Sequence, residues 1–208
     1  PLVAAFFYAP LAFGGTTPET IRVLDQLLAA SFILWCGHLL VCRRRPQIPW
    51  ILFVPLVFLA LLAFTHAFNP RSIFFRETWQ LFEIEGYLSF LPGTLDQATT
   101  LPLVWHYGAI ALGFLVLVDA AVDTKVRWFL LRVVALAGVV IALIGIVQRA
   151  GGADSMLWVG PDRSGTLFFG AFRYNANAGA FLNLSWPAAL ALWLRSRIES
   201  PEARGSFF

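Results

Sequence analysis

The sequence predicts an all-α fold, a polytopic bundle of transmembrane helices. Only 13% of its 208 residues are charged and 59% are hydrophobic, whereas roughly a quarter of the residues in a soluble domain are charged. The apolar residues gather in long runs that end at turn residues or arginines, which is typical of helices that cross a bilayer. The 20 phenylalanines and 8 tryptophans suit lipid-facing and interfacial positions. We therefore expect a single transmembrane domain over residues 1–208.

Six apolar runs are the candidate spans. The first ends at a Gly-Gly-Thr-Thr-Pro turn over residues 14–18 and is short for a span, which takes ~20 residues. Because the sequence starts inside this run and stops just after a polar loop, we expect it to be a segment of a longer membrane protein. The predicted spans lie near 2–13, 23–41, 50–68, 101–122, 128–147 and 178–194.

The segment 69–100 is too mixed in composition to be a span. Three aromatic residues recur in it at steps of four and three, and three polar residues repeat the same steps on a neighbouring stripe. This spacing predicts an amphipathic helix that lies at the membrane interface. The aromatic stripe is Phe75, Trp79 and Phe82, and the polar stripe is Arg76, Gln80 and Glu83.

The basic residues predict the orientation of the bundle, because cytoplasmic loops are enriched in Lys and Arg. With six spans, one set of loops holds nine Lys and Arg residues in short segments, and the other set holds six. The first set is therefore expected to face the cytoplasm, and the segments 14–22, 69–100 and 149–177 to face outward. The three arginines of the 149–177 loop run against this bias, which indicates a local role for them.

The stretch 158–181 is a polar, Gly-rich passage between the last two apolar runs. Arg163 and Arg173 each offer a planar fork of donors that suits phosphate or carboxylate. Asn175 and Asn177 stand where the N-cap of the last span is expected, so the positive end of that helix dipole would point to the same place. These four residues predict an outward-facing anion-binding site beside the bilayer. Simpler roles also fit them: the asparagines can cap the helix, and the arginines can extend to lipid phosphates.

Other polar residues are weaker candidates. Arg76 can contact a lipid-linked substrate, although a surface-lying helix that closes the outer rim is the commoner reason for such a residue. His106 and His66 are expected on the outward side, where a proton carrier would be useful, although an interhelical hydrogen bond is the commoner role of such histidines. Asp119 and Asp123 indicate an interfacial charge cluster. No histidine has two or more Cys, Asp or Glu neighbours at helix-face spacing, so no metal site is expected.

Three features follow one another in residues 141–194. They are the helix ending Ile144-Gly145-x-x-Gln148, then Arg163 ahead of the turn Gly170-Ala171-Phe172, then Asn175-Ala176-Asn177 before a span with small residues and Pro187. This order resembles the O-antigen ligase and polysaccharide polymerase family of membrane proteins, and the rest of the chain is loosely similar to the amino-terminal portion of that family.

The resemblance implies a GT-C-like inverting glycosyltransferase of the bacterial inner membrane. Such a protein transfers a glycan from undecaprenyl diphosphate to an acceptor on the outward face, as in lipopolysaccharide and cell-envelope polysaccharide biosynthesis, without a metal or other cofactor. Arg163 and Arg173 would hold the diphosphate, with Asn175 and Asn177 as orienting groups. The general base would be a histidine in a large outward loop beyond Phe208, so this segment is expected to hold part of the donor site and to be inactive alone.

Two other functions fit the same sequence. A transporter or flippase segment for lipid-linked glycans would use the same outward cationic patch but would need a continuous path between the leaflets. A non-catalytic membrane assembly subunit would need neither. Membrane lipids are the expected surroundings in every case, and no nucleic-acid partner is expected.

Overall fold

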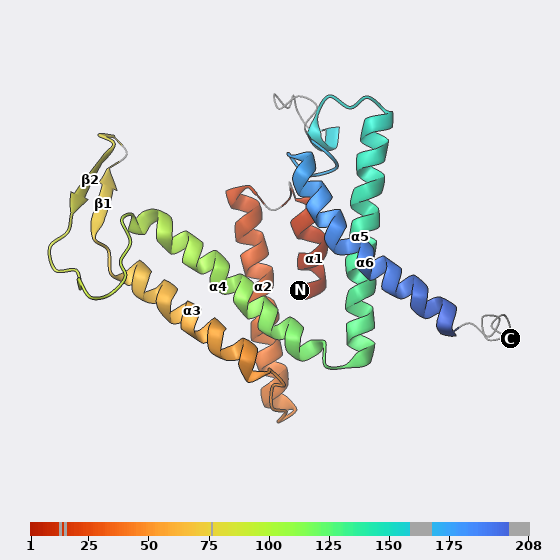
Figure 1. The fold of residues 1–208 in the computed structure, drawn as a ribbon, viewed down its shortest axis with the longest axis horizontal. Coiled ribbons are helices and arrows are strands. Elements are labelled where there is room, and N and C mark those ends of the chain that lie inside the picture. The colour runs from red at the N-terminus through yellow and green to blue at the C-terminus, as the bar shows by residue number, and fades with distance from the viewer. Residues whose placement is uncertain (13, 15, 76, 159–167, 200–208) are drawn as a thin grey trace. The chain divides into compact units, whose positions relative to one another are not determined.

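The computed structural model describes residues 1–199 apart from 13, 15, 76 and 159–167, and this part of the chain is mostly helical (Figure 1). The chain forms two compact units, Pro1–Leu27 with Ala120–Phe208, and Leu28–Asp119. We call them the first and the second unit. Four helices are long and apolar enough to cross a membrane, which indicates a membrane protein. They are α2 (Pro18–Val41), α3 (Trp50–Phe68), α4 (Gln97–Ala120) and α5 (Thr124–Ala150).

The remaining two predicted spans form helices that are too short or too polar to be counted with these four. Helix α1 (Leu2–Leu11) is apolar but has only ten residues. Helix α6 (Asn175–Glu199) has 25 residues, yet it begins and continues with polar side chains that include three asparagines. Helix α3 has the predicted bounds, whereas α4 and α5 begin four residues earlier than expected because Asp96 and Asp123 mark their starts.

In the first unit, α5 and α6 pack side by side in opposite directions. Ser185 of α6 lies against Gly138 of α5, where an added Cβ would come within 2.2 Å of the serine Oγ. Towards the start of α5, the Arg195 guanidinium lies 4.3 Å from the centre of the Trp128 ring. Because contacts between small residues let helices approach closely in a membrane, Gly138 and Ser185 fix where α6 crosses α5.

Side-chain caps begin two helices whose starts lie in the first unit. Thr17 and Thr20 exchange hydrogen bonds around the first turn of α2, in the manner of a capping box, with Pro18 as the first helical residue. Asp123 accepts hydrogen bonds from the backbone N–H groups of Lys125 and Val126 and caps α5. Asp123 is therefore a helix cap, which is a more specific role than the charge cluster expected from the sequence.

In the second unit, the amphipathic helix predicted after α3 is wrong, and the chain forms a hairpin there instead. Strands β1 (Ser72–Phe75) and β2 (Gln80–Glu83) are antiparallel, and Ile73 lies opposite Phe82. Phe75 and Phe82, which a helix would place on one stripe, form an edge-to-face pair with ring centres 5.1 Å apart. The spacing of this segment fits a helix and a strand alike. β-Branched and aromatic residues favour strands, and cross-strand aromatic pairs stabilise them, which favours the hairpin.

Asn69 organises the end of α3 and the loop that returns to α4. Its side-chain amide donates towards the carbonyl groups of Leu88, Leu91 and Pro92, and its Oδ1 accepts from the Leu88 backbone N–H. Gly93 passes so close that a Cβ there would lie 2.3 Å from the Asn69 carbonyl oxygen. Asn69 therefore closes a loop of about twenty residues.

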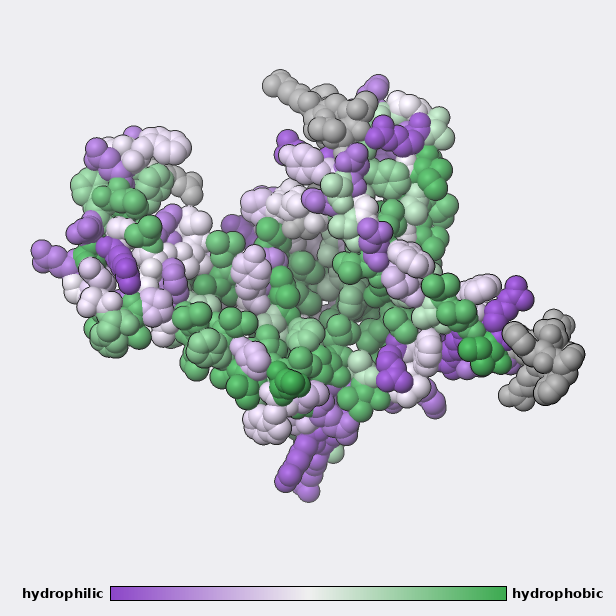
Figure 2. Space-filling view, viewed as in Figure 1, coloured by the Kyte–Doolittle hydropathy of each residue, from purple (hydrophilic) through white to green (hydrophobic). Residues whose placement is uncertain are grey.

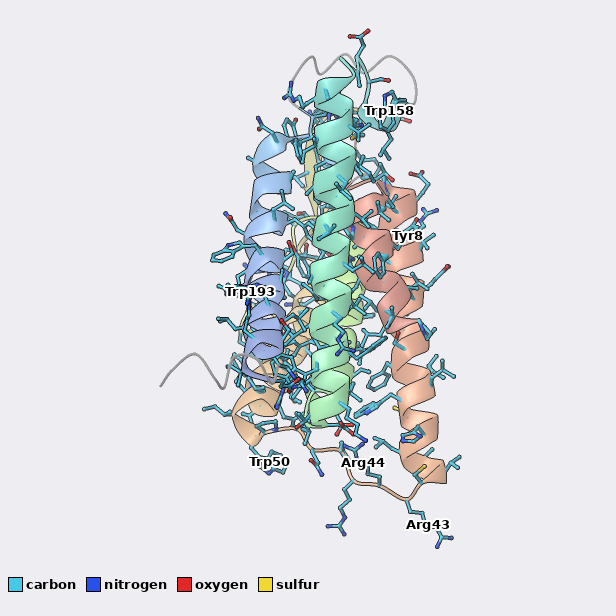
Figure 3. All side chains as sticks on the ribbon, turned by 90° about the vertical axis from the view of Figure 1, so that its right-hand side faces the viewer. Tyr8, Arg43, Arg44, Trp50, Trp158 and Trp193 are labelled. Atoms are coloured by element: carbon cyan, nitrogen blue, oxygen red, sulfur yellow. The ribbon has the colours of Figure 1, made fainter. Side chains whose placement is uncertain are left out.

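Asp119 fastens the opposite end of the second unit. Its buried carboxylate accepts hydrogen bonds from Trp35 Nε1 at 2.8 Å and from the Gln47 backbone N–H at 2.7 Å, and it forms an ion pair with Arg44 at 3.3 Å. Arg44 lies at the same end of this unit as Trp50 (Figure 3). The charge cluster expected at Asp119 is thus a buried clamp that ties the α2–α3 connection to α4.

Candidate anion-binding site at the start of α6

The segment before α6 is a tight turn rather than an open loop. Phe169 and Phe172 exchange two backbone hydrogen bonds of 3.0 Å, so residues 169–172 close a four-residue turn. Gly170 sits in this turn with φ +62°, a conformation that glycine adopts without strain. Ala171 is fully buried, so the turn points its middle into the protein.

The turn packs against the end of α5, and two glycines allow the close contact. A Cβ on Gly145 would lie 2.2 Å from the Phe169 ring, and a Cβ on Gly170 would lie 3.3 Å from the Ile141 carbonyl oxygen. The residues at this contact belong to the hydrophobic core of the first unit. The core consists of Ile141, Ala171, Phe172 and Ala178, with Leu11, Leu157, Phe169 and Phe181 packed against it.

Helix α6 starts directly after this turn, with its predicted polar residues on the surface. The Tyr174 carbonyl accepts from the backbone N–H groups of Asn177 and Ala178, so Tyr174 is the cap residue and Asn175 is the first helical residue. The expectation that an asparagine is the N-cap is therefore wrong by one residue. Arg173, Asn175 and Asn177 are all exposed, and they lie within five residues at the positive end of the helix dipole.

This arrangement offers positive charge and hydrogen-bond donors on a fixed support. The first backbone N–H groups of α6 have no partner within the helix, as at every helix start. Arg173 is an exposed arginine that stands directly after the buried turn and two residues before the first residue of α6. The three histidines of the sequence all belong to the second unit, so the first unit itself contributes no imidazole to this site.

Gln148 is a buried polar residue near this site. In the sequence it was named only as part of the pattern Ile144-Gly145-x-x-Gln148. It lies in the last turns of α5 and is 2% exposed. Among the described residues, neither its Nε2 nor its Oε1 has a hydrogen-bond partner. Burying an amide without partners costs about 1–3 kcal/mol. Gln148 lies near the end of α5 that precedes Trp158 (Figure 3).

Three further residues were predicted from the sequence as weaker or additional site residues. Arg163 and Arg76 lie outside the described residues. His106 is a half-buried residue of α4 in the second unit, where its ring lies next to Tyr107. Within the described residues, no three His, Cys, Asp or Glu side chains gather in a way that would hold a metal ion.

Comparison with known proteins adds no relative, because no family model, no curated protein and no solved structure matches the chain.

Proposed function

We propose that the chain forms the donor-binding part of a membrane glycosyltransferase similar to O-antigen ligases and polysaccharide polymerases. The proposed donor is a glycan on undecaprenyl diphosphate, bound through its diphosphate at the start of α6. The proposed location is the outward face of a bacterial inner membrane. The order of motifs from Ile144 to Pro187 suggests the family, and the geometry of the first unit suggests the ligand.

The observation on which this proposal rests is the position of Arg173. It stands one residue before the cap of α6, exposed, next to Asn175 and Asn177 and on a turn anchored to the core through Gly145 and Gly170. A diphosphate carries negative charge on several oxygens, which a guanidinium and helix N–H groups bind together.

The same contacts would also favour the reaction. When the glycan leaves undecaprenyl diphosphate, negative charge grows on the diphosphate, so donors already pointing at it stabilise the transition state more than the substrate. Arginines at this position do what a metal ion does in other transferases. Arg163 would supply the second guanidinium of the pair.

The proposal is tested by replacing Arg173 with glutamine and measuring undecaprenyl diphosphate binding to the chain in lipid nanodiscs. Loss of one charge-assisted hydrogen bond of about 1.5–3 kcal/mol predicts a roughly 10- to 100-fold weaker affinity. Arg22→Gln is the matched control, since Arg22 is an exposed arginine of the first unit away from this turn in sequence. Equal affinity of the Arg173 variant and the control would refute the diphosphate assignment.

Activity in the intact protein separates the transferase from its alternatives. We expect Arg163→Ala and Arg173→Ala to abolish glycan transfer while membrane insertion and abundance stay normal. Movement of a labelled lipid-linked glycan between the leaflets of proteoliposomes, with transfer absent, would instead identify a transporter.

A further inference from the structure

Residues 42–49, which we call the α2–α3 loop, form a short basic connection between two helices that are long and apolar enough to cross a membrane. Three consecutive arginines, Arg43, Arg44 and Arg45, stand in this loop, and no Asp or Glu occurs from residue 26 to residue 76. Because the loop is short and joins two candidate spans, it stays close to the membrane surface.

The side chains on both sides of the loop form the edge of an exposed apolar surface. Leu40 and Val41 at the end of α2 are 79% and 85% exposed, and Trp50 and Ile51 at the start of α3 are 75% and 80% exposed. Figure 2 shows hydrophilic residues beyond the end of α2 and hydrophobic residues over the face of α3 and α4. Exposed apolar residues that adjoin arginines and a tryptophan are typical of the boundary between hydrocarbon and headgroups.

Asp119 of α4 holds the loop in place and neutralises one of its three charges. The buried carboxylate accepts from the Gln47 backbone N–H at 2.7 Å and pairs with the Arg44 guanidinium at 3.3 Å. Arg43 and Arg45 are exposed, and within the described residues neither forms an ion pair with a carboxylate. The loop therefore presents two uncompensated guanidinium groups, and Figure 3 shows Arg43 extending away from the helices.

Arg43 also occupies a backbone position that favours glycine. The Arg44 backbone N–H donates to the Leu39 carbonyl at 3.1 Å. The Arg43 backbone N–H donates to the Leu40 carbonyl at 3.3 Å, so α2 ends in a Schellman motif. Arg43 is the left-handed residue of this motif, with φ +49°, where a side chain is strained and glycine is not. An arginine at such a position costs stability, which indicates a role for its charge.

We propose that the α2–α3 loop binds the headgroups of anionic phospholipids, with the Arg43 and Arg45 guanidinium groups on the phosphates and the flanking apolar residues against the acyl chains. A guanidinium pairs with phosphate through parallel hydrogen bonds, and basic residues beside a span attract anionic lipids. A zwitterionic lipid carries its own cation and gains less from the two arginines. The surface lies in the second unit and is independent of the diphosphate site proposed at α6.

Native mass spectrometry of the whole chain tests the proposal, with release from micelles that contain equal amounts of phosphatidylglycerol and phosphatidylcholine with the same acyl chains. We expect preferential retention of phosphatidylglycerol. Arg45→Gln should lower this preference about fivefold, which is roughly the contribution of one arginine beside an anionic membrane, and Arg45→Lys should keep most of it.

Arg22→Gln is the matched control, because it removes an exposed arginine of the first unit, and it should leave the preference unchanged. Equal retention of the two lipids, an equal fall in the control, or displacement of the lipid by millimolar inorganic phosphate would overturn the proposal.

A variant at Arg43 separates lipid binding from a structural role. Arg43→Gly removes the guanidinium and relieves the left-handed backbone, so the thermal unfolding midpoint in detergent micelles should stay equal or rise. The preference for phosphatidylglycerol should nevertheless fall about fivefold, whereas Arg43→Lys, which keeps the charge, should preserve it. An unchanged lipid preference in Arg43→Gly, whatever its stability, would overturn the proposal.

Discussion

The support of the α6 site can be tested through the single contact between Gly145 and Phe169. A Cβ added at Gly145 would lie 2.2 Å from two atoms of the Phe169 ring, whereas ordinary van der Waals contact between carbon atoms is about 3.5–4.0 Å. In Gly145→Ala the ring must therefore move by more than 1 Å, and the turn that precedes Arg173 moves with it.

The magnitude follows from two opposing effects. Overpacking of a well-packed core costs about 1–3 kcal/mol, and Gly→Ala inside a helix gains roughly 0.5–1 kcal/mol. Since Phe169 is half-buried and can shift in part, we expect Gly145→Ala to lower the free energy of unfolding by about 1 kcal/mol. Gly37→Ala, with no atom within 4 Å of the new Cβ, should be neutral or stabilising.

A double-mutant cycle with Phe169→Ala isolates this contact. Unfolding would be followed in detergent micelles by far-UV circular dichroism, and binding of undecaprenyl diphosphate would be measured on the same variants. Removing the ring should make Gly145→Ala harmless or stabilising, with a coupling energy of about 1 kcal/mol or more. An identical cost of Gly145→Ala with and without the Phe169 ring would show that the turn does not rest on Gly145.

Two further variants test the polar contacts of the second unit. Asp119→Ala removes three hydrogen bonds and leaves Arg44 without its ion pair. Because Arg44 is partly exposed, we expect the free energy of unfolding to fall by about 2–4 kcal/mol, with a change in Trp35 fluorescence. Asp123→Ala, which removes only a helix cap, should lower it by about 1 kcal/mol. A stability loss no larger than that of Asp123→Ala would contradict the clamp. Asn69→Asp keeps the shape of the side chain but removes the donor and puts a charge beside three carbonyl groups, so hydrogen exchange in residues 86–95 should rise at least tenfold while exchange in α5 stays unchanged. Unchanged exchange in residues 86–95 would show that Asn69 does not hold the loop.

The sequence predicted the helices better than what lies between them. Hydropathy alone placed α3 at its observed bounds, because a membrane span is defined by a local property of about twenty residues. The predicted span 178–194 leaves out Asn175 and Asn177, which lower the hydropathy of α6 as a whole.

The hairpin shows why local periodicity failed. Aromatic residues at 75, 79 and 82 fit a helical stripe, yet Ile73 and Phe75 alternate with polar or inward residues as in a strand, and short segments of this kind fit both patterns. The pairing of Ile73 with Phe82 joins two strands across a turn, so the spacing of residues along one segment does not predict it.

The buried polar contacts were hidden for the same reason. Asp119 is bonded to Trp35, Arg44 and Gln47, which lie more than seventy residues earlier in the chain. From the sequence it was only a carboxylate near basic residues. At the α6 site, composition identified Arg173 and the two asparagines, whereas the glycine contacts that fix the turn depend on side chains packed from another helix.

Four arginines, two in each unit, differ in whether a carboxylate accompanies them among the described residues. At one end of each unit an arginine has an acidic partner: Arg44 pairs with Asp119 in the second unit, and Arg195 pairs with Glu199 in the first. At the other end, Arg71 and Arg173 have no carboxylate partner among the described residues. The sequence predicts that these latter ends face outward, where general bias disfavours arginine. A guanidinium kept beside the bilayer without a protein anion is best stabilised by an anion from outside the chain. A diphosphate bound at Arg173 would be such an anion.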